Sequence, residues 1–265
     1  AQIPTLEPPV PVVKIGLALG ISDINVQAFD GFEGMLLTDR IRSKGGILAN
    51  DRRGTNRARF TIAHELGHFL MEWHELSAVE GFRCRTRDMR ETREDRQHHR
   101  QEAQANRFAI NLLAPWTYVD RHLSRTPDLR DAQKLRRALE ISLEAAVRRM
   151  ITRRDERLAA VVSKDGRVRY TVRGGSFPWV ALTGGDALPR ISAARQAVSS
   201  GNMGFTEIVE AMPGPWTGRT DIDLWEQTRV GKNGTAITLL EAEITEPDDE
   251  FDDGGLAELG PPGFR

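Results

Sequence analysis

The sequence contains a single cysteine, Cys84, and no apolar run long enough to cross a membrane. A lone cysteine excludes an intramolecular disulfide and favours a reducing compartment. The first residues have neither the charged segment nor the apolar segment of a signal peptide. We therefore expect a cytoplasmic protein that makes no contact with a membrane.

The chain also lacks an overall excess of charge, because its net charge is −1 over 265 residues. The charges are unevenly distributed along it. Residues 1–120 have 16 basic and 16 acidic side chains, residues 121–157 have 11 and 6, and residues 158–265 have 10 and 16. This distribution predicts a short basic module between a neutral N-terminal part and an acidic C-terminal part. The charge distribution does not indicate an oligomeric state.

One short motif, His64-Glu65-Leu66-Gly67-His68, indicates a specific chemistry. Residues four apart lie on one face of a helix, so His64 and His68 can offer two imidazoles to one metal ion. Such ligands suit Zn²⁺, with Mn²⁺ as the alternative, and Glu65 would be the general base in peptide hydrolysis. An H-E-x-x-H motif arises by chance about once in a hundred chains of this composition. Apolar flanks predict a half-buried helix over about residues 57–73, which favours a metal site.

A third metal ligand is needed, and His74 is one candidate. It follows His64 at the spacing found in metzincins, whose chain leaves the helix at a glycine. The sequence has Met71 at that position, so we expect the helix to continue and His74 to lie at the surface.

Glu102 is the favoured third ligand. Residues 102–113 have strong helical periodicity, and a glutamate from a second helix completes thermolysin-type sites. Asn106, one turn further, would orient a ligand by hydrogen bonding. Residues 83–100 are rich in arginine, and we expect a solvated loop there, or alternatively a lid or a segment that binds an acidic patch on a substrate. This region also contains the reserve ligand candidates Glu91, Glu94, Asp95, His98 and His99.

Residues 45–50 read as a short strand between turn signals. In zinc peptidases an edge strand beside the metal helix binds the extended substrate by strand addition. We consider this role and an ordinary structural strand equally compatible with the sequence.

Two segments together resemble the signatures of the ImmA/IrrE metallopeptidase family. Residues 57–70 resemble its metal-helix signature, and residues 102–115 resemble the pattern E-x-x-A-N-x-F-A-x-x-L-L-x-P. Gln104 departs from the pattern, since a second glutamate is common there. The resemblance implies a zincin-like, thermolysin-type minimal peptidase core. Its substrate would be a helix-turn-helix transcriptional repressor, whose cleavage induces a stress response to radiation or DNA damage.

The basic module, residues 116–156, contains two predicted helices. Thr126 and Ser142 are the expected N-caps, and residues 140–141 form a turn between the helices. This arrangement fits a helix-turn-helix, which the family resemblance also implies at this position. The residues expected to contact DNA are Arg148, Arg149, Arg153 and Arg154. The alternative is a helical packing element that does not bind DNA.

Residues 157–265 change to a strand pattern with two hairpins, at 158–172 and 224–244, and one helix at 191–199. The pattern predicts an α+β domain, which the resemblance implies to be a GAF-like sensor; a dimerisation or structural role is the alternative. Residues 248–265 are expected to form a disordered acidic tail.

The sequence therefore predicts an α+β chain of three parts: a zinc metallopeptidase-like domain (1–115), a helix-turn-helix-like module (116–156) and a GAF-like domain with its tail (157–265). Its leading predicted function is a zinc endopeptidase that cleaves a transcriptional repressor. The alternative is a DNA-binding transcriptional regulator whose metal site is vestigial or structural.

Overall fold

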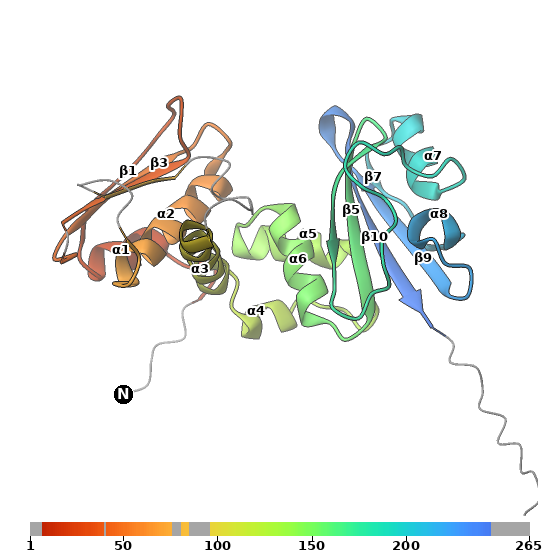
Figure 1. Ribbon diagram of the computed structural model, residues 1–265, viewed down its shortest axis with the longest axis horizontal. Helices are drawn as coiled ribbons and strands as arrows, with labels where there is room; N and C mark the ends of the chain where they lie inside the picture. The colour runs from red at the N-terminus through yellow and green to blue at the C-terminus, as the bar shows by residue number, and fades with distance from the viewer. Residues whose placement is uncertain (1–6, 40, 76–80, 85–95, 245–265) are drawn as a thin grey trace, which may run out of the picture.

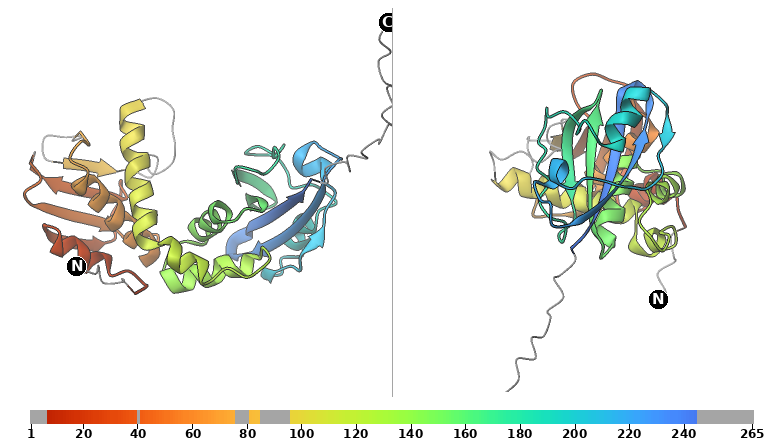
Figure 2. Two further views of the ribbon diagram at one scale, coloured as in Figure 1. Left: turned by 90° about the horizontal axis from the view of Figure 1, so that it is seen from below. Right: turned by 90° about the vertical axis from the view of Figure 1, so that its right-hand side faces the viewer.

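The computed structural model describes residues 7–39, 41–75, 81–84 and 96–244, which form an α+β protein (Figure 1). Figures 1 and 2 show an elongated molecule with one β-sheet at each end and helices between them. Within the described residues, no helix has the length and apolar character needed to cross a bilayer. The predicted α+β class is confirmed. The expected acidic tail, 248–265, lies outside the described residues.

The N-terminal sheet has four strands in the order β1-β3-β2-β4. Strands β1 and β3 are parallel and the other pairs are antiparallel. The strands are β1 (Ile21–Gln27), β2 (Gly34–Thr38), β3 (Gly45–Asn50) and β4 (Gly81–Cys84). The possibility that residues 45–50 form an edge strand is wrong, because β3 lies between β1 and β2. The strand beyond β2 is β4, which the sequence did not indicate.

Two helices, α1 (Val12–Ala18) and α2 (Thr55–Leu70), pack against this sheet, and α3 (Arg96–Leu113) packs against α2. A Cβ atom at Gly67 would lie 3.1 Å from Cδ1 of Phe108 and 3.3 Å from Cα of Ala105. Glycine at this position therefore allows α3 to approach α2 closely, which brings their facing side chains together.

Both helix boundaries near the motif differ from the prediction. Helix α2 ends at Leu70, since Met71 has φ −90° and ψ 87°, outside the helical region. The expectation that the helix continues to residue 73 is therefore wrong. Helix α3 begins at Arg96, so part of the expected loop at 83–100 is helical.

Three shorter helices follow: α4 (Trp116–Asp120), α5 (Leu129–Leu139) and α6 (Leu143–Arg153). The predicted cap of α6 is confirmed, because the Ser142 side chain accepts a hydrogen bond from the Ala145 N–H at 3.1 Å. The predicted Thr126 cap of α5 is wrong. Asp128 performs this function by accepting from the Arg130 N–H at 2.7 Å.

The turn between α5 and α6 contacts the beginning of α2. Arg59 forms an ion pair with Glu140 at 3.3 Å, and the Asn56 side chain donates to the Ile141 carbonyl at 2.9 Å. These contacts connect the helix that contains the H-E-x-x-H motif with the basic module.

The C-terminal sheet is antiparallel, with the order β6-β5-β10-β9-β7 and β8 also paired with β9. Both predicted hairpins are confirmed. The strands are β5 (Arg157–Lys164), β6 (Arg167–Arg173), β7 (Gly204–Phe205), β8 (Val209–Glu210), β9 (Asp223–Val230) and β10 (Thr235–Glu243).

Helices cover both faces of this sheet (Figure 1). Leu158, Ala160 and Val162 belong to the core that includes α5 and α6, whereas Ala159 and Val161 belong to a second core. Helices α7 (Ala193–Ser200) and α8 (Gly214–Thr217) lie on that second face. The first core continues from the N-terminal sheet through α5 and α6 to this sheet. The basic helices are thus part of a shared interior.

Candidate metal centre

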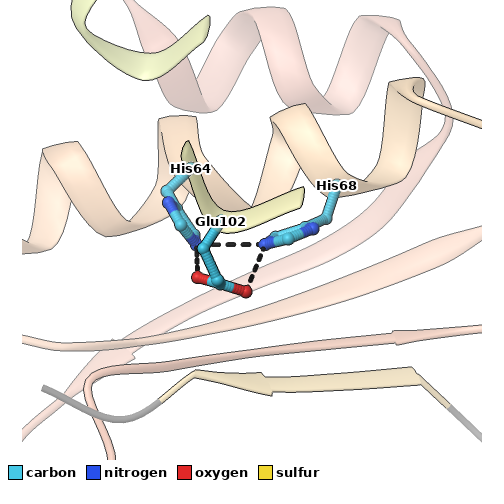
Figure 3. A group of neighbouring side chains, drawn as sticks. All are labelled: His64, His68 and Glu102. Carbon is cyan, nitrogen blue, oxygen red and sulfur yellow. Dashed lines mark hydrogen bonds and ion pairs between the residues drawn. The ribbon is translucent and has the colours of Figure 1, made fainter. Parts of the chain in front are cut away.

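The structure brings His64, His68 and Glu102 together at the contact between α2 and α3 (Figure 3). The two histidines lie one turn apart on α2, and the glutamate comes from α3. The Nε2 atoms of His64 and His68 are 3.1 Å apart. Oε2 of Glu102 lies 3.2 Å from Nε2 of His64, and Oε1 of Glu102 lies 3.2 Å from Nε2 of His68. All three side chains are buried.

This donor set fits a zinc ion. Zinc takes imidazole nitrogen and carboxylate oxygen at about 2.0–2.2 Å in tetrahedral geometry, which separates neighbouring ligand atoms by roughly 3.3 Å. The two Nε2 atoms are 3.1 Å apart, and each lies 3.2 Å from one of the two Glu102 oxygens, so all of these separations are close to that value. Among the described residues, this is the one group of three or more His, Cys, Asp or Glu side chains close enough to hold a metal ion. The geometry therefore supports a metal centre with three protein ligands.

The surroundings shift the pKa values of the three ligands in different directions. Burial lowers the pKa of His68 to about 4, so its imidazole is neutral near pH 7. Burial also opposes the charged form of His64, but Glu102 and Glu65 more than compensate and raise its pKa. Burial would raise the pKa of Glu102, yet hydrogen bonds and charges from both histidines hold it below its ordinary value. Glu102 is therefore an anion, as a ligand must be.

Glu65 is fully buried on α2, next to the first ligand. A Cβ atom at Gly34 would lie only 2.6 Å from Oε1 of Glu65 and 2.4 Å from Cγ2 of Thr61. The carboxylate thus rests against the backbone of β2 at a position where a larger residue does not fit. Gly34 pairs with Ala49 of β3 on one side and with Cys84 of β4 on the other, so Glu65 lies against the sheet at β2.

The remaining ring nitrogen of each histidine also has a partner. Nδ1 of His64 lies 3.0 Å from Oδ1 of Asn106, the residue predicted to orient a ligand. Nδ1 of His68 lies 2.9 Å from Nδ1 of His74, and Nε2 of His74 lies 2.9 Å from Oε1 of Gln104. These second contacts fix the orientation of the two rings.

The tautomers of this chain of contacts follow from the chemistry. A ligand that binds through Nε2 has its proton on Nδ1, so His68 would donate to His74. His74 would then accept at Nδ1 and donate from Nε2 to Gln104. In these two hydrogen bonds, only donation from His68 to His74 and from His74 to Gln104 is compatible with metal binding by His68.

His74 is not at the surface, contrary to the expectation. Its exposed fraction is 2%, because the chain leaves the helix at Met71 and folds back, and Arg42 donates hydrogen bonds to the His74 and Glu72 carbonyls. Neither His74 nor His98 nor His99 belongs to the ligand group. The other reserve candidates, Glu91, Glu94 and Asp95, lie outside the described residues.

Two of the four arginines expected to contact DNA have their side chains within the fold. Arg149 is 7% exposed, stacks on Trp116 with 3.4 Å from Cζ to the ring centroid, and donates to Asn111 and the Ala114 carbonyl. The Arg154 side chain is also 7% exposed and pairs with Asp131 and Glu156.

The other two arginines of this set lie nearer the surface. Arg153 pairs with Asp120 at 2.6 Å, and Arg148 lies over the ring of Tyr170. Helix α6 therefore contributes much of its positive charge to intramolecular contacts.

Two packed helices, a H-E-x-x-H motif and a glutamate from the second helix define the class of metal-dependent peptidases. Residues 21–150 match the model of the IrrE N-terminal-like domain of the M78 peptidases. Residues 21–150 therefore form a domain of the ImmA/IrrE metallopeptidase family, as the sequence motifs predicted. No curated protein matches the chain.

The match also bears on the length of the family domain. It begins at β1 and ends within α6, so it includes both basic helices as well as the metal centre. The second contacts made by His74 and Gln104 were not predicted. The signals available were the spacing of His74 from the motif and the departure of Gln104 from the family pattern.

Proposed function

We propose that this protein is a zinc-dependent endopeptidase that cleaves a helix-turn-helix transcriptional repressor. The observation that carries the proposal is the convergence of three ligand atoms within 4.8 Å of one another, with Glu65 buried beside them. Membership of a metallopeptidase family supports the same chemistry. A zincin-like core of the thermolysin type is the corresponding fold assignment.

His64, His68 and Glu102 would hold the ion, with Zn²⁺ as the first choice and Mn²⁺ as the alternative. When bound, such an ion acts as a Lewis acid on a carbonyl group and lowers the pKa of a water molecule. The carboxylate of Glu65 would take the proton of the attacking water and return it to the leaving amine. Asn106 and His74 hold the two imidazoles in position.

Strand β4 is the proposed binding edge for the substrate backbone. It pairs with β2 on one side, and within the described residues no strand pairs with its other side. A peptide in extended form can add to such an edge by main-chain hydrogen bonds. The position is adjacent to Glu65, because Cys84 of β4 is opposite Gly34.

The proposed physiological role is the induction of a stress response, such as a response to radiation or DNA damage. It rests on the family resemblance, in which peptidase activity removes a repressor. The C-terminal sheet with helices on both faces is proposed as a GAF-like sensor domain. Contacts of Arg59 and Asn56 with the α5–α6 turn provide a physical connection between the metal helix and the rest of the chain.

The alternative is a DNA-binding regulator with a structural or vestigial metal site. The intramolecular contacts of Arg149 and Arg154 leave few arginines of α6 free for phosphate groups. A structural site would also have no use for a buried carboxylate at Glu65. Both points favour the peptidase.

The test is incubation of the zinc-loaded or manganese-loaded protein with purified repressors from the same genome, followed by mass spectrometry of the fragments. We expect one repressor to be cut at one site, and no fragments after removal of the metal with a chelator. Salt-sensitive binding to specific DNA, without cleavage of any repressor under either metal, would support the alternative.

A further inference from the structure

The segment that follows α2 is held by a residue from the loop between β2 and β3. Nη1 of Arg42 donates to the Glu72 carbonyl at 2.6 Å, and Nη2 of the same guanidinium group donates to the His74 carbonyl. Both acceptors are main-chain groups of the stretch in which the chain leaves α2 and folds back. One side chain thus bridges two segments that are 30 and 32 residues away from each other at the two contacts.

The loop that contains Arg42 has a well-defined conformation. Arg42 has φ +51°, which is uncommon for an arginine. Its backbone N–H donates to the Asp39 carbonyl at 3.1 Å, and the Ser43 N–H donates to Oδ1 of Asp39 at 2.9 Å. The hydroxyl group of Thr38, the last residue of β2, donates to the Lys44 carbonyl at 2.8 Å. An uncommon backbone conformation that is stabilised in this way often serves a functional contact.

His74 is fixed at three points, and Arg42 supplies one of them. The His74 carbonyl accepts from Arg42, as described above. The ring has two further contacts, because Nδ1 lies 2.9 Å from Nδ1 of His68 and Nε2 lies 2.9 Å from Oε1 of Gln104. Residues 72–74 lie beyond the end of α2, so helical hydrogen bonds do not hold this backbone. The contact at the carbonyl therefore fixes the backbone from which the His74 ring extends.

The guanidinium group of Arg42 is partly removed from water. Burial lowers the pKa of Arg42, and the carboxylate of Glu72 opposes this shift. A hydrogen bond from a charged donor is stronger in such surroundings than at an exposed surface. Arg52 provides the contrast, since it pairs with Asp30 where both side chains are largely exposed. We therefore expect the Arg42 contacts to matter more than an ordinary surface ion pair.

We propose that Arg42 is a positioning residue for the metal centre, which holds the backbone of His74 so that the His74 ring stays against the ligand His68. The inference rests on the zinc centre of the proposed peptidase. The effect passes from Arg42 to His74 at the carbonyl, and from His74 to His68 at the ring. Loss of the Arg42 side chain should therefore weaken zinc binding only while the His74 ring is present.

A double-mutant cycle on the full-length protein tests this dependence. The zinc affinities of wild type, Arg42→Met, His74→Leu and the double variant are measured by competition with a chromophoric chelator. We expect Arg42→Met to lower the affinity by roughly tenfold, the lower end of the effect of losing support for a metal ligand. In the His74→Leu background the same substitution should change the affinity by less than about twofold.

Two further variants serve as controls. Arg52→Met removes the same charge from an exposed ion pair and should leave the zinc affinity unchanged. An equal loss in Arg52→Met would make net charge the cause and overturn the proposal. Arg42→Lys keeps the charge but lacks the planar fork of the guanidinium group, so its affinity should lie between those of wild type and Arg42→Met. If Arg42→Met does not fold, the cycle is run with Arg42→Lys.

The outcome separates positioning from a merely structural role. An unchanged zinc affinity in the folded Arg42→Met protein, even with a lower melting temperature, would overturn the proposal. The same fold-change with and without the His74 ring would also overturn it, because Arg42 would then not act through His74. Cleavage is not part of this measurement. A protein that shows the coupling but cuts no repressor would refute the peptidase function and retain the role of Arg42.

Discussion

Nδ1 of His68 lies 2.9 Å from Nδ1 of His74, and both rings are buried. His74 therefore acts on the metal centre through a ligand, without joining the ligand group itself. The contact depends on the abrupt end of α2 at Leu70, which allows the next residues to fold back over the helix.

Replacing His74 tests this relationship. His74→Leu removes the acceptor for the His68 ring, so we expect the zinc affinity to fall by roughly tenfold to a hundredfold. Competition with a chromophoric chelator measures the affinity. The control His122→Leu changes a histidine just after α4, whose ring contacts the Tyr118 carbonyl, and should leave zinc binding unchanged. Equal affinities in the two variants would show that His74 does not support the ligand.

Gly34→Ala should reduce peptidase activity by at least about tenfold while the zinc content stays near one ion per chain. The added Cβ would lie 2.6 Å from Glu65 Oε1, so the carboxylate must shift, and overpacking typically costs about 1–3 kcal/mol of stability. Gly46→Ala is the control in the neighbouring strand, because a Cβ atom there would lie 4.0 Å from the Asp23 carbonyl oxygen. Activity and unfolding are measured on both proteins. Unchanged activity in Gly34→Ala would contradict the placement of Glu65.

Arg149→Ala should lower the free energy of unfolding by about 2–4 kcal/mol, the sum of two hydrogen bonds and a stacking contact. Burial of this side chain also lowers the pKa of Arg149 to about 10, as expected for a guanidinium removed from water. Its helical neighbour Arg148 is exposed and lies over the Tyr170 ring, so Arg148→Ala should lower stability by no more than about 1 kcal/mol. Chemical denaturation compares the two. Equal stabilities would mean that Arg149 has no structural role.

Glu226 gives the C-terminal sheet a predictable pH dependence. Burial raises its pKa above the ordinary 4.5, although its carboxylate accepts the Ala193 N–H. The folded state thus binds this proton more tightly than the unfolded state, so stability is lost as the pH rises from 4.5 through the raised pKa. Glu226→Gln cannot ionise and should gain stability relative to wild type as the pH rises above 4.5 and through the raised pKa of Glu226. Thermal unfolding across this range measures the difference; a constant difference would contradict the prediction.

The sequence predicted that His64, His68 and Glu102 come together because the signals for this group are local. Helical spacing places His64 and His68 on one face, and the second amphipathic segment supplies Glu102. The position of β3 could not be predicted in this way. Its neighbours depend on the pairing of β1 and β4, and the strand patterns of residues 21–27 and 81–84 are weak.

The burial of His74 was mispredicted for a related reason. Because residue 71 is methionine and not glycine, we expected the helix to continue. The backbone angles of φ −90° and ψ 87° that end the helix are accessible to methionine, so no glycine is needed. The contact with His68 then arises from tertiary folding, since the two residues belong to different segments. In the same way, the roles of Arg149 and Arg154 depend on Trp116 and Asp131, which only the packed structure brings near.

The most direct test of the central claim compares wild type with Glu65→Gln in one experiment. Each zinc-loaded protein is assayed for metal content and folded state, and then incubated with the repressor substrate for mass spectrometry of the products. The metal centre described above predicts equal zinc content and equal stability, with fragments from the wild type alone. Fragments produced at the same rate by Glu65→Gln would contradict the assignment of Glu65 as the general base.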